Sequence, residues 1–169
     1  MAVRFVNNSI QIKDALNSKA VAWLYEAGGE LEAQTKDNMP PGGEYYSQQK
    51  NAWKHIVDEK ELTCKVGNPL EAALWTEFGT GEYSESPKGG RKGYWVYVKD
   101  QDISLGASHT YTGGKQYTLQ EAKRVVAMLR SDGIDAHYTK GQPAKRPLLN
   151  AYTTLETALK RSAQEMFRG

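Results

Sequence analysis

Apolar residues recur at helical spacing in two long stretches, one near each end of the chain. In residues 14–32 they return every three or four positions, with charged residues between them, and residues 148–166 repeat the pattern. Such a stripe is typical of an amphipathic helix with one buried face. The chain is therefore predicted to have a long N-terminal helix and a C-terminal amphipathic helix, the latter carrying Leu148, Tyr152, Leu155, Leu159 and Met166 on its apolar side.

Two glycines, Gly28 and Gly29, interrupt the first helical pattern. Each costs about 1 kcal/mol relative to alanine inside a helix. The pair therefore predicts a kink, a close contact with another helix, or two shorter helices. A second helix is predicted after the proline- and glycine-rich residues 38–43, with Ser47 as its cap and Ala52, Trp53, Ile56 and Val57 on one face.

The middle of the chain alternates between apolar and polar residues and then changes to helical spacing. Leu62, Cys64 and Val66 alternate with polar residues, which predicts a strand with one buried face. Asn68 and Pro69 follow in a turn. Asn68 is expected to cap a short helix, over residues 69–78, whose first position Pro69 occupies.

Aromatic and β-branched residues at 94–98 predict another strand, either covered on both sides or exposing an aromatic face to a partner. Thr118 and Glu121 form a capping-box pattern before a further helix, and Gly133 with Ile134 fits a Schellman ending. Residues 136–139 are predicted to return as a strand. The fold class is therefore α+β with a small antiparallel or mixed sheet. A single domain is expected over residues 1–169, with an exposed loop at about 82–93 and a helix–strand insertion at about 94–141.

Composition and charge narrow the classes of protein. The 169 residues are 39% hydrophobic and 25% charged, which is typical of a soluble globular chain. No apolar run approaches the roughly 18 residues that span a bilayer, the start lacks the apolar core of a secretory signal, and Cys64 is alone. A cytosol-like compartment and no membrane association are expected. The net charge of +2 is too small to imply nucleic acid, but residues 1–79 carry −3 and residues 80–169 carry +5.

No group of residues has the spacing that catalysis or metal binding requires. The three histidines, His55, His109 and His137, lack a second ligand at a recognised zinc spacing, and His55 is expected to be a surface residue of a helix. Neither a phosphate-binding loop nor a nucleophile elbow is complete. Glu26 and Glu30 are best explained as solvated charges. The chain is therefore predicted not to be an enzyme and to hold neither metal nor cofactor.

A basic loop leaves an alternative open. Lys88, Arg91 and Lys92 lie close in sequence to Tyr94 and Trp95, a combination that can bind phosphates and stack on bases. The alternative function is a small nucleic-acid-binding module. A solvated turn explains the same cations.

Residues 74–81, with Trp75, Glu77, Phe78 and then Gly79, Thr80 and Gly81, resemble the signature of a known family. These are the tail-completion or neck proteins of long-tailed bacteriophages, also described as head–tail joining or minor tail proteins. The proline-rich residues 142–151 before the last helix are similar as well. The resemblance covers about residues 14–81 and 142–167.

The resemblance implies a structural virion protein that forms a ring, hexameric in the family, at the head–tail junction. Its partners would be further copies of itself, the head connector or adaptor, and the tail terminator, tube or sheath proteins, with DNA passing through a lumen. It would be found in the virion neck, and in the host cytoplasm during assembly.

Each residue of the signature then has an expected role. Trp75 and Phe78 are expected to anchor the corner that follows the strand, and Glu77 to pair with a cation nearby or on the next subunit. Gly79 and Gly81, on either side of Thr80, are expected to let the backbone turn. The contacts to a partner or to DNA would come from Lys88, Arg91, Lys92, Tyr94 and Trp95.

Overall fold

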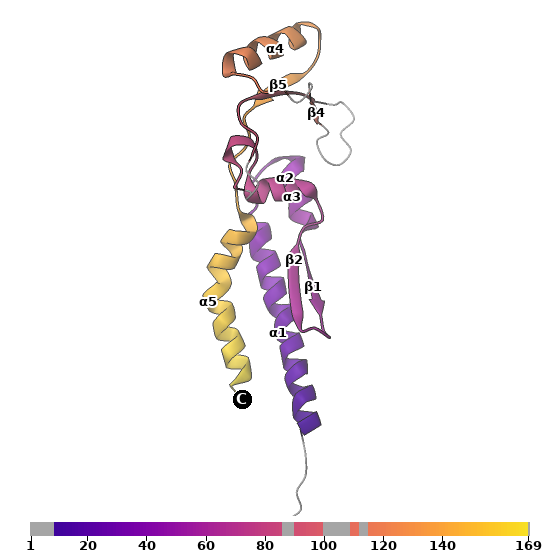
Figure 1. The fold of residues 1–169 in the computed structure, drawn as a ribbon. Helices are drawn as coiled ribbons and strands as arrows, with labels where there is room; N and C mark the ends of the chain where they lie inside the picture. The colour runs from indigo at the N-terminus through magenta and orange to yellow at the C-terminus, as the bar shows by residue number, and fades with distance from the viewer. Residues whose placement is uncertain (1–8, 86–89, 100–108, 112–114, 169) are drawn as a thin grey trace, which may run out of the picture. The chain divides into compact units, whose positions relative to one another are not determined.

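The computed structural model describes residues 9–85, 90–99, 109–111 and 115–168 (Figure 1). The α+β class is confirmed, because the described residues form five α-helices and two antiparallel sheets. Residues 3–6, whose sequence Val-Arg-Phe-Val favours a short strand, lie outside them. The elements in chain order are α1 (Ser9–Asp37), α2 (Gly43–Ala52), β1 (Lys54–Asp58), β2 (Thr63–Gly67), α3 (Glu71–Phe78), the 3₁₀ turn η1 (Gly81–Tyr83), β3 (Trp95–Lys99), β4 (His109–Tyr111), α4 (Leu119–Ser131), β5 (Ala136–Thr139) and α5 (Pro147–Phe167).

The contacts within the chain divide it into two compact units. Unit 1 comprises residues 1–39, 50–69 and 147–169, and unit 2 comprises residues 40–49 and 70–146. Each unit is therefore assembled from segments that are far apart in the sequence. The expectation of one domain over residues 1–169 stays a prediction.

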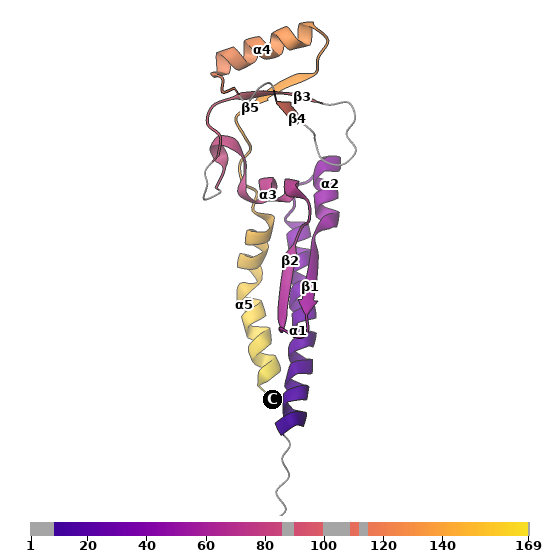
Figure 2. The same ribbon diagram turned by 45° about the vertical axis from the view of Figure 1, so that its right-hand side comes forward.

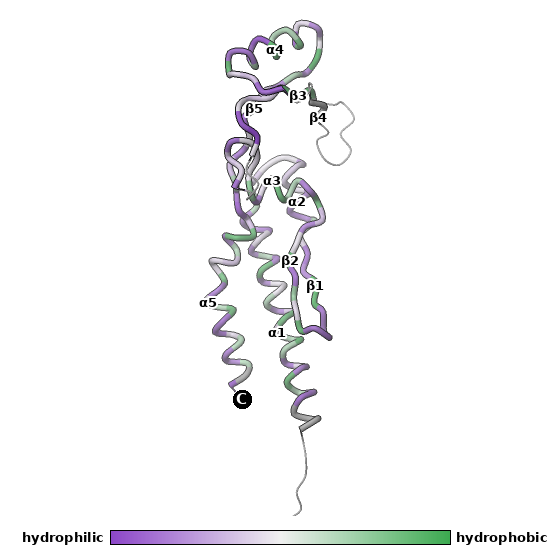
Figure 3. The backbone as a smooth tube through the Cα atoms, viewed as in Figure 1, coloured by the Kyte–Doolittle hydropathy of each residue, from purple (hydrophilic) through white to green (hydrophobic). Residues whose placement is uncertain are grey.

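In unit 1 the two predicted long helices, α1 and α5, lie side by side (Figures 1 and 2). Ala27 of α1 and Ala151 of α5 are both buried. Polar and apolar stretches alternate along both helices, as a one-sided contact requires (Figure 3). The two amphipathic helices predicted at the ends of the chain therefore pack against each other.

Helix α1 continues through Gly28 and Gly29 without interruption. A Cβ atom added at Gly28 would lie 2.5 Å from Cys64 Sγ and 3.2 Å from the Cβ of His55. The glycine therefore makes room for the hairpin of β1 and β2. Of the three expectations, two shorter helices are wrong, and the close contact is present but is made with a sheet instead of a helix.

The helix predicted from Ser47 to Val57 is wrong in its second half. Helix α2 starts at Gly43 and ends at Ala52, and Lys54–Asp58 forms β1. This strand pairs antiparallel with β2, in a register that places His55 opposite Val66. The β-branched Ile56 and Val57 suit a strand, and pairing with β2 decides the conformation, which the helical spacing alone did not reveal.

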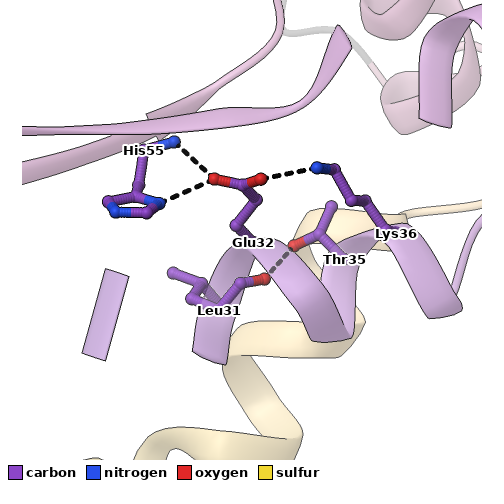
Figure 4. Close-up of polar contacts among 5 residues, drawn as sticks. All are labelled: Leu31, Glu32, Thr35, Lys36 and His55. Atoms are coloured by element: carbon purple, nitrogen blue, oxygen red, sulfur yellow. Dashed lines mark hydrogen bonds and ion pairs between the residues drawn. The ribbon is translucent and has the colours of Figure 1, made fainter. Parts of the chain in front are cut away.

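A charged cluster holds the hairpin on α1 (Figure 4). Oε2 of Glu32 accepts a hydrogen bond from the backbone N–H of His55 at 2.9 Å and lies 2.6 Å from its Nδ1. The other carboxylate oxygen accepts from Lys36 Nζ at 2.5 Å. The Lys36 ammonium, with help from His55, lowers the pKa of Glu32 to about 2. His55, expected to be a surface residue of a helix, is instead half-buried on β1 and fixes the strand.

Unit 2 contains the three-stranded sheet, ordered β4-β3-β5, with α4 packed against β3 and β5. Its core consists of Val96, Ala122, Val126 and Ala136. Trp95 is buried as well as Val96, and the two point to opposite faces of β3. Of the two expectations for this strand, burial on both sides is the one observed here.

Both predicted ends of α4 are confirmed. The Thr118 side chain accepts from the Glu121 N–H, and the Glu121 carboxylate accepts from the Thr118 N–H at 2.8 Å. At the other end Gly133 has φ +80°, its N–H donates to Arg130 O, and Ile134 N–H donates to Leu129 O at 3.0 Å. These two bonds define a Schellman motif.

Candidate functional site

The candidate site is α3 with the corner that follows it, the segment that carries the family resemblance. The helix begins at Glu71, two residues later than predicted. Leu70 occupies the N-cap position with φ −83° and ψ 128°, and no side chain caps the helix. Because Leu70 is extended, Pro69 cannot be the first helical residue, and the capping role predicted for Asn68 is wrong.

Helix α3 buries polar residues and exposes apolar ones. Its buried residues are Ala73, Thr76 and Glu77. Its large apolar side chains are exposed in the isolated chain: 58% for Leu74, 39% for Trp75 and 45% for Phe78. Trp75 and Phe78, which are expected to anchor the corner, are thus both partly exposed, and their role as anchors stays a prediction.

The buried polar groups of α3 have partners within unit 2. The Thr76 hydroxyl donates to Gln49 Oε1 at 2.8 Å, and Gln49 is itself buried on α2. This pair connects α3 to α2. Glu77 acts on Arg146, since its charge adds to the larger effect of Glu85 in raising the pKa of the Arg146 guanidinium. The cation expected near Glu77 thus has a candidate in the same unit.

The corner after α3 is attached to the segment before α5 by backbone hydrogen bonds. The Thr80 N–H donates to Gln142 O at 2.9 Å, and the Glu82 N–H donates to Lys140 O at 2.9 Å. The Gln142 N–H returns to the Thr80 hydroxyl at 3.1 Å. Thr80 therefore contributes to the corner with both its backbone and its side chain.

Gly79 and Gly81 have φ values of +70° and +60°, as the turn at this position predicts. They are also crowded. A Cβ atom on Gly79 would lie 2.7 Å from Ala144 N and Tyr83 O, and one on Gly81 would lie 2.2 Å from Lys140 O. Both positions therefore need glycine for its backbone conformation and for its small size.

The predicted basic and aromatic contacts are only partly brought together. The Arg91 guanidinium lies 5.6 Å from the centre of the Trp95 ring, and a Cβ on Gly81 would lie 2.6 Å from the same ring. Trp95 is thus buried against the corner and cannot stack on a base. Tyr94 is half-buried and its ring contacts that of Tyr138 edge to face.

Lys88 and Lys92 are the other two basic residues of the loop, and the structure describes only Lys92. Lys92 is exposed, whereas Lys88 lies outside the described residues. The ion pair between Glu85 and Arg146 flanks this loop and lowers the pKa of the Glu85 carboxyl, chiefly through its hydrogen bonds with Arg146. One acidic and one basic residue of the corner are therefore already paired with each other.

The charge difference between the two halves of the sequence is absent from the two folded units. Unit 1 and unit 2 each contain 11 Lys or Arg residues and 10 Asp or Glu residues, which gives each a net charge of +1. Each unit combines segments from both halves, so the acidic and basic stretches are mixed. Neither unit is strongly basic.

Within the described ranges, no group of three or more His, Cys, Asp and Glu residues is placed to hold a metal ion. None of the helices in the same ranges combines the length and apolar character needed to cross a bilayer. Glu26 and Glu30 are both exposed on α1, as expected for solvated charges. Helix α3 thus carries exposed apolar side chains next to a corner whose backbone is held by hydrogen bonds.

Sequence reasoning missed two features of this site. The helical spacing of residues 69–78 gives no sign that Leu74 is exposed, and Gln49 is not among the predicted site residues. The spacing of Leu74 and Phe78 does identify a shared face, but it carries no information on whether that face is covered.

No protein-family model, curated protein or solved structure matches the chain.

Proposed function

We propose that the chain is a structural virion protein of a tailed phage or phage-like particle. It forms a homo-oligomeric ring at the head–tail junction through protein–protein contacts, and does no covalent chemistry. The observation that supports this best is the outward apolar face of α3, formed by Leu74, Trp75 and Phe78 in the segment of the family signature.

Exposed large apolar residues clustered on one short helix are expected at an interface. Water contact with such a surface is unfavourable by about 25 cal/mol for each Å². Aromatic residues are enriched at the centres of interfaces, where they contribute most of the binding energy. The α3 face combines two aromatic rings with a leucine, and a neighbouring subunit would bury all three.

The support beneath this face is rigid. Thr76 is bonded to Gln49, and Thr80 and Glu82 are bonded to the segment before α5. A surface that is ordered before binding loses less entropy on association. The corner would therefore present the α3 face in one orientation, as a ring with a fixed angle between subunits requires.

The other partners follow from the resemblance. They are the head connector or adaptor on one side and the tail terminator, tube or sheath on the other, with DNA passing through the lumen. The alternative of a nucleic-acid-binding module has less support, because Trp95 is buried and each unit carries a net charge of only +1.

A pair of matched substitutions tests the proposal. Leu74 on α3 and Met128 on α4 are 58% and 59% exposed, and both belong to unit 2. Leu74→Glu is expected to give a folded chain that sediments as a monomer, whereas Met128→Glu assembles like the wild type. Imaging of particles assembled with the wild-type chain is expected to place it in a ring at the neck.

Two results would contradict the proposal. One is a Leu74→Glu variant that assembles as well as the wild type and the Met128→Glu control. The other is a chain that is absent from assembled particles.

A further inference from the structure

Residues 13–19 of α1 pack little against the described part of the chain. Residues 13–19 are all exposed, including Leu16 at 46%. A short stretch of helix is marginally stable in water unless its apolar side packs against something. Residues 13–19 of α1 therefore lack a packing partner within the described part of unit 1.

The register of α1 and α5 explains why. Asn38 Nδ2 donates to Pro147 O at 3.1 Å, and Trp23 Nε1 donates to Ser162 Oγ at 3.0 Å. Residues 23 and 38 are 15 positions apart, as are 147 and 162, so the helices run in opposite directions with equal steps. The end of α5 at Phe167 thus lies level with about residue 18 of α1.

The apolar stripe of α1 continues past this point. Leu16 precedes Ala20 and Trp23 at spacings of four and three, and these two are partly covered in unit 1. The surface that contacts α5 higher up the helix therefore extends towards the N-terminus after α5 has ended. It is suited to a second helix that packs in the same manner.

A complementary patch lies at the other end of the same unit. Leu149 and Tyr152, three residues apart on α5, are 50% and 46% exposed, while Ala151 is buried. Leu149 lies level with about residue 36 of α1, so it is some 20 residues, or about 30 Å along the helix axis, from Leu16. The described part of the unit therefore has apolar side chains exposed in two places, at Leu16 and at Leu149 with Tyr152, which cannot reach each other within one chain.

We propose that the first turns of α1, through Leu16, pack against Leu149 and Tyr152 on α5 of a second copy of this chain. Two different patches at opposite ends of one unit give a head-to-tail contact, which repeats from copy to copy and closes into a ring when the rotation allows. The inference rests on the proposed homo-oligomer and adds a contact separate from the α3 face. Each copy would use its α1 end on one neighbour and its α5 on the next.

Substitutions that introduce opposite charges at Leu16 and Leu149 test whether these two residues meet between copies of the chain. Leu16→Glu and Leu149→Lys, made in separate full-length chains, are each expected to raise the dissociation constant of the oligomer at least tenfold and to sediment as monomers. An equal mixture of the two variants is expected to assemble, because the glutamate introduced in one chain would meet the lysine introduced in the other, and the second type of contact is unchanged. Ser18→Glu is the matched control, since Ser18 lies on the opposite side of α1 and is also exposed.

The outcomes separate this inference from the proposed function. If Leu16→Glu and Leu149→Lys assemble like Ser18→Glu while Leu74→Glu remains a monomer, the α1–α5 contact is wrong and the ring stands. If each variant is a monomer and the mixture is too, Leu16 does not meet Leu149 and the inference is overturned. A wild-type chain that is a monomer at every concentration would overturn it as well.

Discussion

Helices α3 and α4 belong to the same compact unit but differ in the kinds of residues that they bury. Helix α4 turns Ala122 and Val126 into the core against β3 and β5 and leaves its charged residues in water. Helix α3 buries Thr76 and Glu77 and leaves Leu74 exposed. The first arrangement stabilises the unit, and the second leaves large apolar side chains of α3 exposed to solvent.

The two helices also end differently, although both end at a glycine with positive φ. Gly79 after α3 is enclosed by backbone atoms, whereas a Cβ atom on Gly133 after α4 would have nothing within 4 Å. The end of α4 is therefore set by its own sequence. The corner after α3 is set by the segment that packs on it, residues 140–145.

The largest expected effect distinguishes these two glycines. Gly79→Ala should lower the free energy of unfolding by about 3–5 kcal/mol, since it adds both a left-handed backbone cost and a clash. Gly133→Ala should cost only about 1 kcal/mol, from the backbone alone. Urea unfolding monitored by circular dichroism measures both, and equal losses would show that the corner is not crowded.

The next effect compares the two apolar faces. Val126→Ala removes a buried side chain of unit 2 and should cost about 2 kcal/mol. Leu74→Ala removes an exposed one and should change the free energy of unfolding by no more than about 0.5 kcal/mol, while weakening assembly. The same unfolding measurement, combined with sedimentation, checks the pair. A loss at Leu74 as large as that at Val126 would mean that α3 packs within the chain.

The start of α4 gives a smaller effect. Thr118→Ala removes the hydroxyl that caps the helix and should cost about 1 kcal/mol, whereas Thr118→Ser keeps the hydroxyl and should cost little. Helix α3 has no side-chain cap, so no residue before it is expected to show this pattern. If Ser and Ala were equally destabilising, the capping bond would not contribute.

The smallest expected effect concerns Glu121, the acidic residue of the same capping box. The hydrogen bonds from the Thr118 N–H and hydroxyl lower the pKa of Glu121 below its ordinary 4.5. Because the folded value is the lower one, the box stabilises α4 above about pH 4.5 and is lost as the pH falls through the folded pKa. NMR titration of the Glu121 side chain should show the lowered value, and it should rise part of the way towards 4.5 in Thr118→Ala, which removes the hydroxyl and keeps the backbone N–H. An unchanged titration in that variant would show that the hydroxyl does not contribute to the lowered pKa.

Local signals in the sequence predicted α4 almost completely. Thr118, Glu121 and Gly133 lie within a few residues of the elements they define, so their chemistry is visible without the fold. The conformation of Ile56 and Val57 was not predictable in this way, because it depends on pairing with β2. The start of α3 was missed for a related reason, since Asn68 and Pro69 form a capping pattern that the extended Leu70 excludes.

The candidate site shows the same limit. The positive φ at Gly79 and Gly81 followed from the sequence, but their crowding did not, because much of it comes from residues 140–144, far along the chain. The grouping of Leu74 with Phe78 on one face was also predictable. Its exposure was not, since helical spacing does not state which face of a helix the rest of the chain covers.

The close approach of the β1–β2 hairpin to Gly28 limits where residues can be inserted into or deleted from α1. Gly28 receives Cys64 and His55, and Glu32, one turn further on, binds His55 through its backbone and its ring. One residue inserted between them would rotate the carboxylate by about 100° around the helix and separate the two contacts. Residues added before position 20 would leave both in place. The N-terminal end of α1 is therefore the part of unit 1 where length can vary without moving the hairpin.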